Sequence, residues 1–172
     1  PADFVETAEC WELALENTKG PSVIALTRQK VPALRTGTTE NKTSFGAYIL
    51  KETGEHCLVK IFATGSEVSV ACTVQEYLYQ QHTIGSEVIS MPCWSIFDQQ
   101  SEEYKESILG DSSCVRVSIE AGVTTGWEKY VGSKGLKIGI DQFGLSGSQE
   151  DLWAYFGFTC DTIVAKIMKF FN

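Results

Sequence analysis

Short apolar runs alternate with longer amphipathic segments from residue 46 to the end of the chain. The runs are short for helices and are bounded by glycine, proline or polar residues, so they predict β-strands. The run Leu58-Val59-Lys60-Ile61-Phe62-Ala63 is almost continuously apolar, as in a strand whose two faces are both covered. The predicted strands are residues 46–50, 57–64, 87–90, 115–119 and 136–140.

The segments between the strands show the 3.6-residue period of helices. The clearest is residues 66–81, with Val70, Val74, Tyr77 and Leu78 on one face. Further helices are predicted at residues 101–109, 127–131, 149–156 and from 161 to 171. This alternation predicts an α/β fold: a three-layer sandwich in which helices flank a mostly parallel (mixed) sheet.

The last two helices have predicted boundaries. Ser146 is expected to cap the helix over residues 149–156, and Gly157 to end it. Asp161 is expected to cap the final helix. Its core-facing residues would be Ile163, Val164, Ile167 and Met168.

The first 44 residues differ from the rest. Residues 3–16 predict a helix capped by Asp3, with Ala8, Trp11 and Leu15 as apolar positions. A strand is predicted at residues 22–26. Residues 30–44 have no hydrophobic period and read as an exposed linker that marks a domain boundary.

Composition narrows the function classes. The net charge is −8, which disfavours nucleic-acid binding. No apolar run reaches the roughly 18 residues of a membrane span. The N-terminus has neither the pattern of a signal peptide nor an initiator Met, so a fragment or a processed product is expected.

Six cysteines are present, and none forms a C-x-x-C pair. Reduced, buried thiols of a cytoplasmic protein explain them better than disulfides or zinc ligation. They are Cys10, Cys57, Cys72, Cys93, Cys114 and Cys160.

Gly65 and Ser66 form a turn between a predicted strand and a predicted helix. Backbone N–H groups at such a turn can hold an anion. The segment nevertheless lacks the glycines of a dinucleotide fingerprint and the Gly-Lys-Ser/Thr of a P-loop. A tight turn capped by Ser66 is therefore the favoured interpretation, and an anion site at Gly65 and Ser66 is the alternative.

Four other polar residues lie near strand ends or in loops. Glu120 could act as a base and Asp141 as a metal ligand, but neither has a partner at a diagnostic spacing. A structural carboxylate is the better interpretation of Glu120, and a loop-ordering role that of Asp141. His56 and His82 lie in polar contexts typical of solvated side chains.

Arg28 follows the predicted strand 22–26, where α/β proteins gather ligand-binding groups. Its guanidinium could bind a phosphate through two hydrogen bonds. From the residue alone, a solvated surface arginine is the better interpretation. Composition and pattern thus give a soluble, acidic α/β domain without a specific chemistry.

Several segments taken together are more specific. They are Leu26-Thr27-Arg28-Gln29 with Pro32; Ile61-Phe62-Ala63-Thr64-Gly65-Ser66-Glu67-Val68; Val88-Ile89-Ser90-Met91-Pro92-Cys93 with Phe97-Asp98-Gln99-Gln100 and Tyr104; Glu120-Ala121-Gly122 with Gly126-Trp127-Glu128-Lys129-Tyr130-Val131-Gly132; and Ile138-Gly139-Ile140-Asp141 with Phe143-Gly144 and Phe156-Gly157-Phe158-Thr159. They resemble the LSRQNLP, ATGSEV, VSMPC…FD.Q…Y, EAG…GWE.YVG and IG.D.FG…FGFT segments of transketolases. The match runs along essentially the whole chain. Its departures, such as Thr27, Lys30, Gln142 and residues 145–148, are modest.

The resemblance implies a parent enzyme with a diphosphate-binding, a pyrimidine-binding and a C-terminal domain. Residues 1–36 would be the end of the pyrimidine-binding domain, residues 37–44 a linker, and residues 45–172 the C-terminal domain. Thiamine diphosphate and Mg²⁺ (or Ca²⁺) would sit between the first two domains of a homodimer.

By the same resemblance, the parent transfers a two-carbon ketol unit between sugar phosphates in the pentose phosphate pathway. The family's metal motif, activating glutamate and substrate histidines are not found in the sequence, so the chain is expected to be inactive and to carry no catalytic residue. Arg28 resembles the arginine that binds the substrate's phosphate.

Two alternatives stay open at this point. One is a stand-alone anion-binding or scaffolding module with the same fold. The other is part of a different thiamine enzyme, such as a deoxyxylulose-phosphate synthase or a two-oxoacid dehydrogenase subunit, although the GWE.YVG and SMPC segments argue against that.

Overall fold

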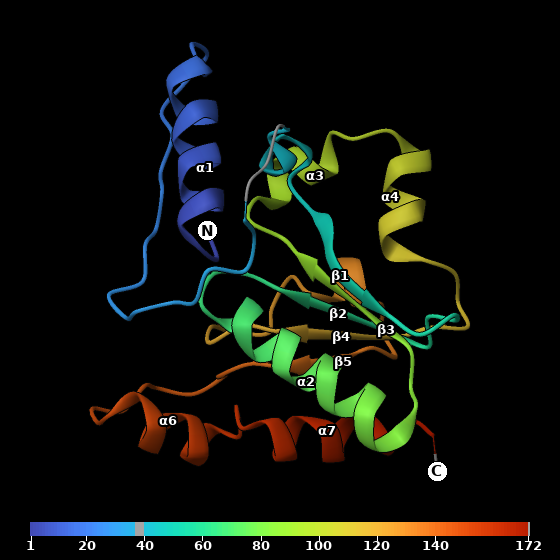
Figure 1. Ribbon diagram of the computed structural model, residues 1–172. Coiled ribbons are helices and arrows are strands. Elements are labelled where there is room, and N and C mark those ends of the chain that lie inside the picture. Colours follow the sequence, from blue (N-terminus) through green and yellow to red (C-terminus); the bar gives the residue numbers. More distant parts are fainter. Residues whose placement is uncertain (37–39, 172) are drawn as a thin grey trace.

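A mixed β-sheet forms the centre of the computed structural model, which describes residues 1–36 and 40–171 (Figure 1). Within these residues the sheet has five strands in the order β1-β3-β2-β4-β5. The strands are β1 (Tyr48–Thr53), β2 (Val59–Ala63), β3 (Ser86–Ser90), β4 (Val115–Ile119) and β5 (Leu136–Ile138). Only the edge strand β1 runs antiparallel, against β3, and the other described pairs are parallel.

Helices cover both faces of this sheet. In Figure 1, α2, α6 and α7 lie below it and α3 and α4 above it. The helices are α1 (Phe4–Glu16), α2 (Glu67–His82), α3 (Trp94–Asp98), α4 (Glu102–Leu109), α5 (Glu128–Val131), α6 (Gln149–Phe156) and α7 (Cys160–Met168), with a 3-10 turn, η1 (Lys42–Phe45). The sequence had predicted all of the α-helices except the five-residue α3.

Two hydrophobic cores lie between the sheet and the helices on its two faces. Ile61 and Val117 point to one face of the sheet and pack with residues of α2 and α7 such as Leu78 and Ile167. Phe62 points to the other face. There it packs in a cluster with Ile89, Met91, Phe97, Ile108, Trp127 and Tyr130. The predicted three-layer α/β sandwich is therefore confirmed.

Two predicted helix caps are wrong, and a third residue has the predicted position without the capping hydrogen bond. Ser148, not Ser146, caps α6, because its hydroxyl accepts a hydrogen bond from the N–H of Asp151. Thr159, not Asp161, caps α7 in the same way. Ser66 stands at the start of α2 but makes no capping hydrogen bond through its side chain. Gly157 does end α6, with the left-handed backbone that glycine adopts most readily (φ +77°).

Helix α1 has the predicted extent and the predicted cap, but its buried face is not the apolar one. The Asp3 carboxylate accepts the Glu6 N–H at 2.8 Å. Glu6 and Glu9 are buried, whereas Trp11 and Leu15 are 53% and 77% exposed. The apolar positions expected to cover a core therefore face solvent, and acidic residues face the domain.

These buried acids find donors across a long stretch of sequence. Glu6 Oε1 accepts the Tyr48 hydroxyl at 2.7 Å and the Ser90 hydroxyl at 2.6 Å, and Glu6 Oε2 accepts the N–H of Ala2. Asp3 Oδ2 accepts the N–H groups of residues 34 and 35, each at 3.0 Å. A buried carboxylate is tolerated when several donors satisfy it, so these bonds attach α1 to β1, β3 and the segment that precedes residue 37.

Glu9 makes a third such contact. Its Oε2 accepts from Arg35 Nη2 at 2.7 Å, and from the hydroxyl and N–H of Thr43 at 2.7 and 3.2 Å. Burial raises the pKa of Glu9, but the hydrogen bonds and charge of Arg35, with the bonds from Thr43, outweigh it and hold the pKa below its ordinary value. Thr43 is buried, so this part of the predicted linker is not exposed. Residues 37–39 of that linker lie outside the described residues.

The strand predicted at residues 22–26 is not formed. The segment is extended, and no described strand lies alongside it to pair with its backbone. Val23 is 93% exposed. A strand needs a neighbour for its N–H and C=O groups, so a strand-like sequence without that neighbour stays irregular.

Candidate functional site

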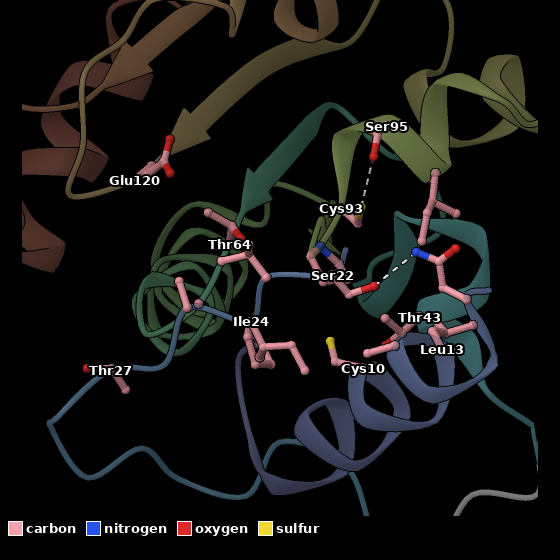
Figure 2. A pocket seen from close by; sticks show the side chains of 18 of the residues that line it. Cys10, Leu13, Ser22, Ile24, Thr27, Thr43, Thr64, Cys93, Ser95 and Glu120 are labelled. Atoms are coloured by element: carbon pink, nitrogen blue, oxygen red, sulfur yellow. Dashed lines mark hydrogen bonds between the residues drawn. The ribbon is translucent and has the colours of Figure 1, made fainter. Parts of the chain in front are cut away.

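A pocket of about 760 Å³ lies at the carboxyl ends of the parallel strands (Figure 2). The loops after β2, β3 and β4 form one side of it, and α1 with the extended segment 21–27 forms the other. Its polar groups include Ser22, Thr43, Thr64, Ser66, Ser95, Glu67 and Glu120. No lysine or arginine lines it within the described residues.

The strand order explains why a pocket forms here. The connection from β2 leads through α2 on one face of the sheet, whereas the connection after β4 leads into α5 on the other. The two loops leave the sheet in opposite directions and open a crevice between them, the usual ligand position in open α/β sheets. Gly65 makes the turn after β2 with φ +58°.

Glu67 fills the beginning of α2 beside this pocket. It is buried, and its Oε1 accepts the Ser66 hydroxyl at 2.6 Å while its Oε2 accepts the N–H of Ala121 at 3.1 Å. The side chain thereby links the loop after β2 to the loop after β4. The N-terminus of α2 is thus next to a carboxylate of its own chain.

The protonation of Glu67 is shifted by its surroundings. Burial raises the pKa of its carboxyl, and the charge of Glu120 acts in the same direction. The hydrogen bonds from Ser66 and Ala121 lower it, but the net shift is upward. Two carboxyl groups thus face the region in which Gly65 and Ser66 were predicted to hold an anion. That anion site stays a prediction, and the neighbouring charge works against it.

Glu120 and Asp141 both make structural contacts. Glu120 Oε2 accepts the indole N–H of Trp127 at 2.7 Å. Asp141 accepts the N–H and the hydroxyl of Thr124 at 2.7 and 2.8 Å, which lowers its pKa and orders the loop as predicted. Neither residue has a catalytic partner within the described chain.

Arg28 lies outside the pocket. It is exposed, and within residues 1–36 and 40–171 its guanidinium has no hydrogen bond or ion pair. Thr27 beside it does line the pocket. The pocket therefore brings Gly65, Ser66 and Glu120 together, while Arg28 is at its margin and Asp141 is elsewhere.

The described part of the chain contains no candidate metal site. There, no three His, Cys, Asp or Glu side chains come together in a way that could hold an ion. His56 and His82 are exposed, as predicted. None of the described helices combines the length and apolar character that a bilayer span requires.

Sequence reasoning missed two features of this region. The sequence motif that contains Glu67 does not reveal its contact with Ala121, and no spacing connects Cys10 with Cys93, although both line the pocket. The only available signal for Glu67 was its place one residue after a strand–glycine turn, where a carboxylate can reach the next loop.

Comparisons with known proteins identify the family to which the chain belongs. A family model described as the transketolase-like C-terminal domain matches residues 46–159. A transketolase from Sinorhizobium medicae is 43% identical over 98% of the chain, and a chloroplastic transketolase from Craterostigma plantagineum is 45% identical over 96%. The chain spans 24% and 32% of these two proteins, respectively.

Solved structures agree with this assignment. A crystal structure of a transketolase mutant from Pichia stipitis matches with a TM-score of 0.88 at 37% identity, over 98% of this chain and 24% of that one. Transketolase from Leishmania mexicana matches with a TM-score of 0.85 at 33% identity, over 96% of this chain and 24% of that one. The chain therefore belongs to the transketolase family, where it corresponds to the C-terminal part.

Proposed function

We propose that the chain serves as the C-terminal part of a thiamine-diphosphate-dependent transketolase that transfers a two-carbon ketol unit between sugar phosphates. The observation that carries this proposal is the match over 98% of the chain to about a quarter of a transketolase. The cofactor supplies the carbanion chemistry in such enzymes, and the protein supplies binding and orientation. A cytoplasmic homodimer is part of the same proposal.

The cofactor itself does not fit this chain. The described residues offer no cluster that could hold its divalent metal. The pocket presents Glu67 and Glu120 and no described basic side chain, so it is unsuited to a diphosphate. Thiamine diphosphate with Mg²⁺ (or Ca²⁺) is therefore assigned to the parts of the parent enzyme outside this chain, and the chain by itself is proposed to be inactive.

Residues 1–36 are proposed to be the end of the pyrimidine-binding domain, followed by a linker over residues 37–44 and the C-terminal domain over residues 45–172. Two observations support this division. The outer face of α1 exposes Phe4, Trp11 and Leu15, and the extended segment 22–26 leaves its backbone unpaired. The rest of that domain would cover the exposed apolar side chains with its core and pair the free backbone with its sheet.

The inactivity of the chain is tested by a ketol-transfer assay. The 172-residue protein, with added thiamine diphosphate and Mg²⁺, is expected to give no turnover of a ketose phosphate and an aldose phosphate. A full-length transketolase of the family is the positive control. Measurable turnover by the chain alone would contradict the proposal.

Arg28 is proposed to bind the phosphate of the sugar substrate in the intact enzyme. Its guanidinium is exposed and has no described partner, so it is available to an anion. Arg28→Ala in the intact enzyme is expected to lower kcat/KM for phosphorylated donors by roughly 10- to 100-fold, with a much smaller effect on unphosphorylated donors. Lys30→Ala, an exposed cation two residues away, is the matched control. An equal loss with both kinds of donor would argue against a phosphate contact.

A further inference from the structure

Two cysteines meet at the edge of the sheet opposite the pocket. Cys57 lies two residues before β2, and Cys114 lies directly before β4. The two strands are parallel neighbours in which Val59 is paired with Val115, and the N–H of Val115 donates to the carbonyl of residue 58 at 2.9 Å. The strand register therefore places Cys114 beside residue 58, the neighbour of Cys57, although the two cysteines are far apart in the sequence.

Both thiols donate hydrogen bonds to backbone carbonyl groups at the start of β2. The Cys114 thiol donates to the Cys57 carbonyl at 3.1 Å, and the Cys57 thiol donates to the Val59 carbonyl at 3.4 Å. Burial, followed by the charge of Glu87, raises the pKa of the Cys57 thiol to about 12. The sulfur atom of Cys114 thus lies 3.1 Å from the backbone carbonyl oxygen of Cys57.

The other described cysteines lack this arrangement. Among the described contacts no hydrogen bond joins Cys10 to Cys93, and the Cys93 thiol contacts the hydroxyl of Ser95 instead. Cys72 is buried, and Cys160 contacts the carbonyl of Thr73. Cys57 and Cys114 are both partly exposed, so an oxidant can reach them.

We propose that Cys57 and Cys114 are an oxidation site at which a peroxide forms an intramolecular disulfide between β2 and β4. The thiolate of Cys114 attacks a peroxide oxygen, which breaks the O–O bond and leaves a sulfenic acid on Cys114, and the released hydroxide takes up a proton to become water. The second thiol then attacks the sulfenic sulfur, which forms the S–S bond and releases a second water. The two thiols lose two protons and two electrons, and one hydrogen peroxide is reduced to two waters.

The effect on the protein follows from where the bond lies. The strands are already paired by backbone hydrogen bonds, so the disulfide joins segments that are close in the folded state. The closed loop runs from residue 57 to residue 114 and contains β2, α2, β3, α3 and α4. A long loop restricts the unfolded chain strongly, so the oxidised form is expected to be the more stable one.

The experiment oxidises the 172-residue chain with hydrogen peroxide at pH 8.5, where more thiolate is present than at neutral pH. Peptide mapping without reductant is expected to find one linked pair, Cys57–Cys114. The Tm is expected to rise by at least about 5 °C and to return after dithiothreitol.

Variants separate this pair from the other thiols. Cys57→Ser and Cys114→Ser are each expected to abolish the linked peptide and the rise in Tm, whereas Cys160→Ser keeps both. A disulfide between other cysteines, oxidation of Cys57 or Cys114 to separate sulfinic acids, or an unchanged Tm with the linked peptide absent would overturn the proposal. A result of this kind leaves the ketol-transfer proposal unaffected, because no step of that reaction uses either thiol.

Discussion

The carboxylate of Glu67 lies in surroundings that disfavour its charged form. It is buried at the start of α2, and Glu120 is near enough to raise its pKa. Its hydrogen bonds from Ser66 and Ala121 hold the loops after β2 and β4 together. A glutamine has the same shape, can accept from Ala121 and donate to Ser66, and carries no charge.

Glu67→Gln is therefore expected to change how stability depends on pH. Between the ordinary glutamate pKa and the raised pKa of the folded state, unfolding releases a proton, so the wild-type chain loses stability as pH rises. The variant lacks this loss. Its stability relative to wild type, measured by urea unfolding, should increase from about pH 4 to pH 7.

Glu103→Gln on the exposed side of α4 is the control and should show no such trend. A stability difference between Glu67→Gln and wild type that stays constant over this pH range would show that the Glu67 carboxyl titrates normally in the folded chain.

At the scale of elements, α1 shows how a helix can be held by polar contacts. Its buried residues Asp3, Glu6 and Glu9 bind donors from β1, β3, η1 and residues 34–35, whereas most of its large apolar side chains face outward. The attachment therefore depends on paired charges and hydrogen bonds more than on buried hydrocarbon.

Arg35→Met tests this attachment. The Arg35–Glu9 pair has side-chain exposures of only 10% and 8%, and the guanidinium also lies 4.7 Å from the centre of the Tyr48 ring. Removing one partner of a buried pair leaves a buried charge, so a loss of about 3 kcal/mol is expected. Limited proteolysis should cut residues 17–33 sooner than in wild type.

Lys51→Met breaks the more exposed pair Lys51–Glu76 and is expected to cost less than about 0.5 kcal/mol. The double variant Glu9→Met with Arg35→Met should recover part of the loss, because no unpaired charge remains. Equal costs for Arg35→Met and Lys51→Met would mean that α1 is not held by this pair.

The sequence predicted most elements because their hydrophobic periods are local properties. Residues 57–64 and 115–119 form strands, and residues 66–81 a helix, at nearly the predicted bounds. Caps were harder, since Ser146 and Ser148 are equivalent as residue types and only the backbone geometry selects Ser148. The strand predicted at residues 22–26 is not formed because a strand needs a neighbour to pair with, and none of the described strands pairs with this segment.

At the scale of the whole molecule, α1 and the segment that follows it expose several large apolar side chains, which are together called the α1 surface. Its members are Phe4, Trp11, Leu15, Val23 and Leu26. A surface of this kind is unusual for a monomer and favours association.

The candidate pocket could not be predicted from the sequence, because it requires the loops after β2, β3 and β4 to meet residues of α1.

The 172-residue chain is therefore expected to self-associate at high concentration. Light scattering after size exclusion, at roughly 100 µM protein, should give a mass above that of one chain. The double variant Trp11→Lys with Leu15→Lys should shift the chain towards the monomer, because it places charge on the apolar surface.

Tyr155→Lys also replaces an exposed aromatic residue. It stands on α6, a helix that lies away from α1 (Figure 1), so it should not change the mass. A wild-type chain that is monomeric at this concentration would count against an associating role for the α1 surface.

The contacts of Asp3, Glu6 and Glu9 also determine which parts of the chain can rotate independently. A boundary at residues 37–44 would ordinarily act as a hinge between two bodies. Here α1 lies on the far side of that boundary in sequence, yet it is bonded to Tyr48, Ser90 and Thr43 on the near side. Bending at residues 37–44 therefore cannot move α1 away from the sheet unless these hydrogen bonds break.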